Sequence, residues 1–281
     1  MKGYLSSGMT TCAGCAMELV ARTVFETLGQ NTVVVIPPGC AAILAGYSGE
    51  TPLHLPVVMS NLEATAAFAS GIRAGLDILG KENVQVLGFA GDGGTADIGL
   101  QSLSGAAERN ERIIYVCYDN EAYMNTGIQS SGSTPTGAWT TTTPAGKTTP
   151  RKDLAQIMAA HRIPYVATAS VAYPEDLSRK VKKASQAQGT AFIHVHSPCP
   201  TGWRFPPSKT IEVARMAVRT GMWLLYEVEN GKTTINIKPG DLPVQRYLEL
   251  QGRFKNLSDA EVKALQAEAD ARRAFVRSLQ T

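Results

Sequence analysis

Short apolar runs alternate with helical stretches along the first two thirds of the chain, and this alternation constrains the fold more than any other feature. Five runs are predicted as strands, at residues 32–36, 84–90, 113–118, 165–169 and 191–195. Helical patterns lie between them, at residues 13–28, 61–79, from beyond 94 to about 108, and 174–188. Strands that alternate with helices form parallel sheets, and the crossover helices cover the faces. We therefore predict an α/β fold with a mostly parallel sheet flanked by helices.

The last sixty residues have a different pattern. Two strands, a short helix and a long helix are predicted there, at residues 224–228, 233–237, 244–251 and 258–279. The Asn-Gly pair at residues 230–231 is typical of a hairpin turn, and Ser258 and Glu261 have the spacing of a helix capping box. We predict one α/β domain over residues 1–221 and a C-terminal hairpin and helix appendage over residues 222–281, packed on that domain or on a partner chain.

Composition excludes several classes of protein. Only 18% of the 281 residues are charged, against roughly 25% in typical soluble domains, which fits either buried subunit contacts or simply a sequence rich in small residues. The net charge of +3 comes without a basic stripe interleaved with aromatics, which argues against nucleic-acid binding. No apolar run is long enough to span a membrane, and residues 1–11 lack the apolar core of a signal peptide. We expect a cytoplasmic protein.

Two polar clusters follow the second and third predicted strands. Residues 91–94 read Gly-Asp-Gly-Gly, and Asp119 and Asn120 end the next strand. Ligands of open α/β sheets bind beyond the carboxyl ends of strands, and glycines let a backbone approach a phosphate closely. Asp92 would repel a phosphate unless a cation such as Mg²⁺ lay between them. The glycine motif alone is explained by a tight turn, but the second cluster favours a binding site.

Five cysteines suggest a metal site rather than a disulfide framework. Cys12 and Cys15 form a C-x-x-C pair, Cys40 follows Pro-Gly, and Cys199 lies between two prolines. Four thiolates suit Zn²⁺ or an iron–sulfur cluster, and a C-x-x-C pair alone could also be a redox pair. The spacing leaves these alternatives open. Cys117 lies inside a predicted strand and is interpreted as a small buried hydrophobe.

The remaining polar features receive simpler interpretations. Residues 130–149 are polar and rich in Gly and Pro, and a loop of that length beside a polar strand end favours a functional role. His194 and His196 share one face of a predicted strand. We interpret them as hydrogen-bonded histidines of the core or its rim rather than as a metal pair.

The sequence of residues 118–127, YDNEAYMNTG, together with GDGG and the loop up to Lys147, resembles the thiamine-diphosphate site of 2-oxoacid:ferredoxin oxidoreductases. The resemblance is to the β subunit of the pyruvate:ferredoxin oxidoreductase type and extends from Cys12 to about Phe254. It implies that Asp92, the Asn120 side chain and the Ala122 backbone carbonyl ligate Mg²⁺. It also implies a set of residues that contact the cofactor, namely Gly39, Gly91, Asp92, Gly93, Gly94, Asn120, Asn125 and Thr126. Asn125 and Thr126 are in addition the candidate catalytic residues.

The same resemblance implies that Cys12, Cys15, Cys40 and Cys199 hold a [4Fe–4S] cluster. The implied reaction is the oxidative decarboxylation of a 2-oxo acid to an acyl-CoA, with electrons passed through the cluster to ferredoxin or another acceptor. Because the chain has room for one such domain only, the pyrimidine-binding domain is expected on a partner chain, and a ferredoxin-like chain is a further expected partner.

More than one substrate and more than one function remain open from the sequence. Pyruvate comes first, but residues 59–60 are Met-Ser where pyruvate-type chains often have His-Asn, and Ala-Ala-Ile follows Cys40. A branched or aryl 2-oxo acid such as phenylglyoxylate therefore stays open. The alternative functions are a subunit of a non-redox thiamine-dependent decarboxylase or synthase, and a non-catalytic electron-transfer or zinc-stabilised scaffold subunit.

Overall fold

The computed structural model describes residues 3–46 and 50–280. These residues form an eight-stranded sheet with the order β2-β1-β3-β4-β6-β5-β7-β8. The six strands from β2 to β5 in that order run parallel, and β7 and β8 continue the sheet antiparallel. The strands are β1 (Thr32–Ile36), β2 (Val57–Met59), β3 (Gln85–Gly91), β4 (Ile114–Asp119), β5 (Tyr165–Ser170), β6 (Ala191–His196), β7 (Leu225–Glu229) and β8 (Lys232–Ile237). The predicted α/β fold is confirmed.

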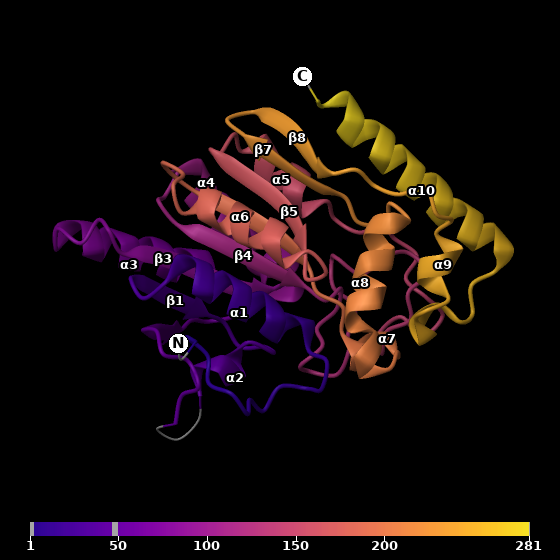
Figure 1. Cartoon of the computed structure of the whole chain (residues 1–281), viewed down its shortest axis with the longest axis horizontal. Helices are drawn as coiled ribbons and strands as arrows, with labels where there is room; N and C mark the ends of the chain where they lie inside the picture. The colour runs from indigo at the N-terminus through magenta and orange to yellow at the C-terminus, as the bar shows by residue number, and fades with distance from the viewer. Residues whose placement is uncertain (1–2, 47–49, 281) are drawn as a thin grey trace.

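Helices cover both faces of this sheet (Figure 1). They are α1 (Ala16–Leu28), α2 (Ala42–Ala45), α3 (Thr65–Ile78), α4 (Leu100–Glu108), α5 (Leu154–Ala160), α6 (Pro174–Ala184), α7 (Pro200–Trp203), α8 (Thr210–Arg219), α9 (Gln245–Leu248) and α10 (Asp259–Ser278). A π-helical turn, η1, spans Gly93–Asp97, and 3₁₀ turns lie at Pro207–Lys209 and Gly252–Phe254. Within the described ranges, none of these helices has the length and apolar character needed to cross a membrane.

Alternate residues of the strands feed two separate cores. One core packs α1 and α6 against one face of the sheet, and the other packs α3, α4 and α5 against the opposite face. A third apolar cluster joins α7, α8, α9 and α10 around the buried ring of Trp203. Strands that are buried on both faces read as continuous apolar runs, which is why the central strands are visible in the sequence.

The five predicted central strands are confirmed to within a residue or two at each end. The first helix starts at Ala16 rather than at residue 13, because Gly14 adopts a φ of +71° that a helix does not allow. The helix predicted at 244–251 is only α9 followed by a 3₁₀ turn. Strand β2 and helices α2, α5, α7 and α8 were not predicted. Strand β2 has three residues at the sheet edge, α2 and α7 have four residues each, α5 has seven, and α8 follows a proline-rich stretch. The capping box of α10 is confirmed.

Residues 222–281 add β7 and β8 to the same sheet, beside β5. Asn230 and Gly231 connect the two strands with φ of 50° and 81°, the conformation of a type I′ turn. Helix α10 then packs through Leu265 and Ala269 on the cluster around Trp203. The C-terminal segment therefore reaches the carboxyl end of the sheet, where the polar clusters lie.

Candidate active site

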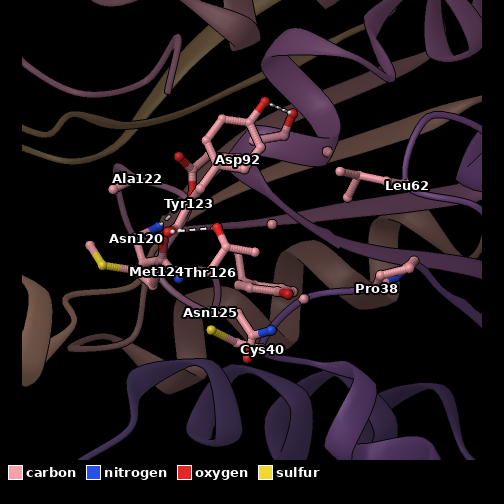
Figure 2. Close-up of a pocket in the computed structure, with 15 residues that line it drawn as sticks. Pro38, Cys40, Leu62, Asp92, Asn120, Ala122, Tyr123, Met124, Asn125 and Thr126 are labelled. Carbon is pink, nitrogen blue, oxygen red and sulfur yellow. Dashed lines mark hydrogen bonds between the residues drawn. The ribbon is translucent and has the colours of Figure 1, made fainter. Parts of the chain in front are cut away.

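The central strands β3 and β4 are direct neighbours, so their carboxyl ends lie side by side. Their register pairs Gly91 with Tyr118, which brings Asp92 next to Asp119 and Asn120. A cavity of about 130 Å³ opens there, lined by Pro38, Gly39, Cys40, Leu62, Gly91, Asp92, Gly93, Gly94, Tyr118, Asn120, Ala122, Tyr123, Met124, Asn125 and Thr126. Figure 2 shows these side chains gathered around one space. All eight residues predicted to contact the cofactor line this cavity.

Gly93 has no room for a side chain, and Gly91 has little. A Cβ on Gly93 would lie 2.3 Å from the ring of Tyr123, and one on Gly91 would lie 3.2 Å from the ring of Tyr118. Gly93 also begins the π-helical turn η1, a rare distortion that occurs often at functional sites. The Tyr123 hydroxyl donates to the Gly93 carbonyl over 3.2 Å and to Asp97 Oδ2 over 3.1 Å. The floor of the cavity is therefore formed by the backbone of these glycines, and the hydrogen bond from Tyr123 holds Gly93 in place.

Three oxygen-bearing groups converge at one side of the cavity. The Asp92 carboxylate is 1% exposed. One terminal atom of the Asn120 amide lies 3.0 Å from Asp92 Oδ1 and 2.8 Å from the Ala122 carbonyl oxygen. With the amide oxygen in that place, three oxygens face one another, an arrangement that a cation would stabilise. With the amide rotated by 180°, its nitrogen would donate to both neighbours.

Asp92 is held firmly in this position. Its Oδ1 accepts from the backbone N–H of Asn120 over 3.2 Å, and its Oδ2 accepts from the Ser131 hydroxyl over 2.5 Å. Burial, and then the nearby carboxylate of Asp119, raise the pKa of Asp92 well above its ordinary value. Burial therefore favours the neutral form of this carboxyl group, whereas a bound cation would favour its ionised form.

A second cavity of about 190 Å³ adjoins the first. It is lined by Thr10, Thr11, Cys12, Cys15, Ala16, Met17, Cys40, Ile43, Asn120, Asn125, Ser197, Pro198, Cys199 and Pro200. The structure thus brings together four cysteines from three distant parts of the sequence. The fifth, Cys117, is buried in β4 among apolar residues. Cys40, Asn120 and Asn125 line both cavities.

The cysteine cavity has room for more than one atom. Burial raises the pKa of Cys15 to about 11 and that of Cys40 to about 12, and the nearby Cys199 adds to both shifts. Across residues 3–46 and 50–280, no three His, Cys, Asp or Glu side chains are close enough to hold a single metal ion. A polynuclear cluster spaces its ligand sulfurs more widely than one ion does. The four cysteines around this cavity are the candidate ligands that the sequence pattern predicts.

Comparisons with known proteins agree with this geometry. The model for the C-terminal TPP-binding domain of thiamine pyrophosphate enzymes matches residues 38–195. The chain is 49% identical to the pyruvate synthase subunit PorB of Methanothermobacter thermautotrophicus, over 95% of both chains. It is 50% identical to the ketoisovalerate oxidoreductase subunit VorB of Pyrococcus horikoshii, over 92% of this chain and 88% of that protein. The chain belongs to this family of 2-oxoacid:ferredoxin oxidoreductase subunits.

Membership in the 2-oxoacid:ferredoxin oxidoreductase family fixes the class of reaction. The subunit uses thiamine diphosphate in the CoA-dependent oxidative decarboxylation of a 2-oxo acid and works within a multi-subunit enzyme. Membership in this family excludes the alternative of a non-catalytic scaffold subunit. The solved 2-oxoglutarate:ferredoxin oxidoreductase of Magnetococcus marinus shares the fold, with a TM-score of 0.62 and 21% identity over 93% of this chain and 94% of that one.

The two strand histidines of this oxidoreductase subunit have hydrogen-bonded partners. His194 Nε2 lies 2.6 Å from Asp119 Oδ2, and His196 Nε2 lies 3.3 Å from the hydroxyl of Tyr247. Both are buried, and burial lowers the pKa of His196 well below its ordinary value. The prediction of hydrogen-bonded core histidines is confirmed for His194, and in part for His196, whose Nδ1 has no hydrogen-bond partner among the described residues.

Sequence reasoning missed three residues that shape the site. Tyr123 packs on Gly93, Ser131 donates to Asp92, and Glu121 lies between Asn120 and Ala122 with both carboxylate oxygens bound by arginines. Ser131 lies in the polar loop 130–149, which was predicted to be functional as a whole. No local pattern singles out Glu121, because both of its arginine partners are distant in the sequence.

Proposed function

We propose that Asp92, Asn120 and the Ala122 carbonyl bind Mg²⁺ in this subunit. The supporting observation is the spacing of the three groups, 2.8 and 3.0 Å. Mg²⁺ binds oxygens at 2.0–2.1 Å in octahedral geometry, so neighbouring ligand oxygens lie about 2.9–3.0 Å apart. Two of the three oxygen–oxygen separations, from Asn120 to Asp92 and from Asn120 to Ala122, therefore already match those of neighbouring ligands of Mg²⁺. The fit is to a small cation that keeps further positions for diphosphate oxygens.

The glycine-lined floor and the residues at the mouth receive thiamine diphosphate in this proposal. Thiamine diphosphate supplies carbanion chemistry when bound. Gly91, Gly93 and Gly94 let the backbone approach a diphosphate that Mg²⁺ neutralises. Asn125 and Thr126 are exposed at the mouth, and Asn125 faces both cavities. These two residues are placed to orient the reacting end of the cofactor and its substrate.

We further propose that Cys12, Cys15, Cys40 and Cys199 hold a [4Fe–4S] cluster. The supporting observation is that their cavity shares Cys40 with the cofactor cavity. A cluster there would lie beside the cofactor and accept electrons over a short distance. Burial raises the pKa of Cys15 and Cys40, so their thiolate forms require a positive charge nearby, which a bound cluster would supply.

The substrate proposed is a 2-oxo acid with a short apolar side chain. Among the residues that line the cofactor cavity, none is Arg, Lys or His, and Leu62 and Met124 are apolar. A second carboxylate on the substrate would therefore meet no cationic side chain among the described residues that line this cavity. The chain is equally similar to a pyruvate synthase subunit and to a ketoisovalerate oxidoreductase subunit. We keep pyruvate first, and a branched 2-oxo acid second.

The site is proposed to be completed by a pyrimidine-domain chain. Apart from Asp77 near its C-terminal end, the exposed residues of α3 are small or apolar, namely Ala67, Phe68, Gly71, Ala74, Gly75 and Ile78. Ile78 is 86% exposed, and a side-chain carbon on Gly71 or Gly75 would meet nothing within 4 Å. Such a face suits a closely packed subunit contact. A ferredoxin-like chain is the second proposed partner, as the carrier of electrons away from the cluster.

The metal assignment is tested with Asp92→Asn in the assembled enzyme. We expect loss of Mg²⁺-dependent thiamine diphosphate binding, measured by calorimetry, and loss of turnover. Asp176→Asn changes another buried aspartate, far from the cavity, and should leave binding intact. Unchanged Mg²⁺-dependent binding in Asp92→Asn would refute the assignment.

The cluster and the substrate are tested on anaerobically purified enzyme. We expect about four iron and four acid-labile sulfide atoms per site, lost in Cys40→Ala. Zinc without iron would refute the cluster. Turnover of a panel of 2-oxo acids, with and without coenzyme A, identifies the substrate class, and a preference for dicarboxylic acids would contradict the proposal.

A further inference from the structure

Glu121 lies between two of the proposed metal ligands, Asn120 and Ala122, in a left-handed backbone conformation with a φ of 63°. This conformation is costly for a residue that has a Cβ, and it persists only where surrounding contacts over-determine it. The turn places the Asn120 amide 3.0 Å from Asp92 Oδ1 and 2.8 Å from the Ala122 carbonyl oxygen. Whatever fixes this turn therefore fixes the relative positions of the ligands.

Both the side chain and the backbone of Glu121 are tied down. The side chain is 2% exposed; its Oε1 accepts from Arg151 over 3.0 Å, and its Oε2 accepts from Arg253 over 2.5 Å. Its backbone N–H donates to Asp119 Oδ1 over 2.8 Å, and its carbonyl accepts from the Thr134 hydroxyl over 2.6 Å. Charge-assisted bonds from guanidinium groups are strong and directional, so this carboxylate has one allowed position.

Arg253 acts on the same turn through a second contact. Its guanidinium stacks on the buried ring of Trp203, with 3.7 Å from its carbon to the ring centroid. The Trp203 indole N–H donates to the Asn120 carbonyl over 2.7 Å. One arginine from the C-terminal segment thus supports two consecutive residues of the turn, Asn120 through Trp203 and Glu121 directly. Trp203 ends the short helix α7, which starts just after Cys199.

We propose that Glu121, Arg253 and Trp203 form a clamp that holds residues 120–122 in the geometry required for binding the metal ion. The three are positioning residues, because none of them lines the cofactor cavity. The inference rests on the proposed Mg²⁺ site. It adds that the affinity of this site is set by a 3₁₀ turn of the C-terminal segment, far from the metal ligands in sequence.

A buried carboxylate elsewhere in the fold provides a matched control. Asp176 in α6 is 3% exposed, and its carboxylate lies between Arg179 and Lys180 at 2.5 and 2.6 Å. It lines neither cavity. Glu121→Gln and Asp176→Asn therefore remove the same kind of interaction from the core, but only the former touches the turn. If Glu121 had only a structural role, both substitutions would change metal affinity to the same extent.

The test measures metal affinity rather than activity. The assembled enzyme is stripped of thiamine diphosphate and Mg²⁺, and the Mg²⁺ concentration for half-saturated cofactor binding is determined by calorimetry. Loss of a partner that orients a metal ligand typically weakens metal binding 10–100-fold. We expect the Mg²⁺ concentration for half-saturation to rise about 10–100-fold in Glu121→Gln and Arg253→Met. Arg253→Lys keeps the charge and should show a smaller rise, and Asp176→Asn should show a rise of less than twofold. The thermal midpoint is recorded for each variant.

Trp203→Phe provides a second route if Glu121→Gln does not assemble. It keeps an aromatic ring under Arg253 and removes only the N–H bond to Asn120, and we expect at least a fivefold weaker response to Mg²⁺. Metal affinities of Glu121→Gln or Trp203→Phe that match Asp176→Asn, while Asp92→Asn abolishes metal-dependent binding, would overturn the clamp and leave the metal site standing. Unchanged binding in Asp92→Asn would overturn both.

Discussion

At the scale of single residues, burial decides how the cysteines behave. Cys12 is exposed, whereas Cys15 and Cys40 are largely covered and their pKa values rise to about 11 and about 12. The thiolate is the reactive and metal-binding form. At pH 8 the thiolate fraction is then on the order of 10⁻³ for Cys15 and 10⁻⁴ for Cys40. Without a cationic occupant these two residues are poor nucleophiles.

This difference predicts an order of alkylation. In assembled enzyme from which iron has been removed, iodoacetamide at pH 8 should label Cys12 first and Cys40 much more slowly, as followed by peptide mass spectrometry. The rate at Cys40 should rise about tenfold per pH unit up to its pKa, because raising the pH increases the thiolate fraction. Enzyme with its cluster intact is the control and should be protected at all four cysteines. Equal rates at Cys12 and Cys40 in the iron-free enzyme would contradict the burial argument.

At the scale of elements, special backbone conformations fix the corners of the fold. The hairpin between β7 and β8 turns through Asn230 and Gly231, both with positive φ. This hairpin extends the sheet beside β5 and leads to the C-terminal segment that carries Arg253. The Asn-Gly pair predicted the turn because these two residues tolerate left-handed backbone better than others.

Gly231→Ala is expected to loosen this hairpin. Forcing a Cβ into a left-handed position costs about 1–2 kcal/mol, so amides of β7 and β8 should exchange roughly 5–30-fold faster in hydrogen-exchange measurements on the assembled enzyme. Asn230→Gly keeps the turn conformation without strain and should not accelerate exchange. An equal acceleration in both variants would show that the turn does not depend on backbone strain.

At the scale of the whole molecule, part of the surface is suited to contact with a partner chain. Apart from Asp77, the exposed residues of α3 are small or apolar, and Asn125 and Thr126 are exposed at the mouth of the cofactor cavity. The low charged fraction of 18% is consistent with this, because a surface that contacts another protein chain needs fewer charged residues than one exposed to water. We therefore expect that this chain is active only together with the partner chain proposed to complete its active site.

Gly71→Gln tests the α3 face. The side chain would enter open space in the isolated chain, and replacing glycine inside a helix is favourable by itself. The variant should therefore stay folded yet fail to co-purify with the partner subunits, as seen by size-exclusion chromatography. Ala274→Gln makes a similar change on the exposed side of α10 and should assemble normally. Normal assembly of Gly71→Gln would place the contact elsewhere.

Local sequence patterns predicted the parallel sheet, the hairpin and the capping box, because apolar runs buried on both faces and short turn and cap motifs are visible along the chain. The eight expected cofactor contacts and the four cysteines came from the resemblance of short motifs to a known family. The residues that support these motifs from a distance become visible only in the folded chain. Contacts such as Arg253 with Glu121 and Trp203 with Asn120 join segments that no periodicity relates. The packing of the C-terminal segment across the end of the sheet creates them, and so it decides the shape of the proposed metal site.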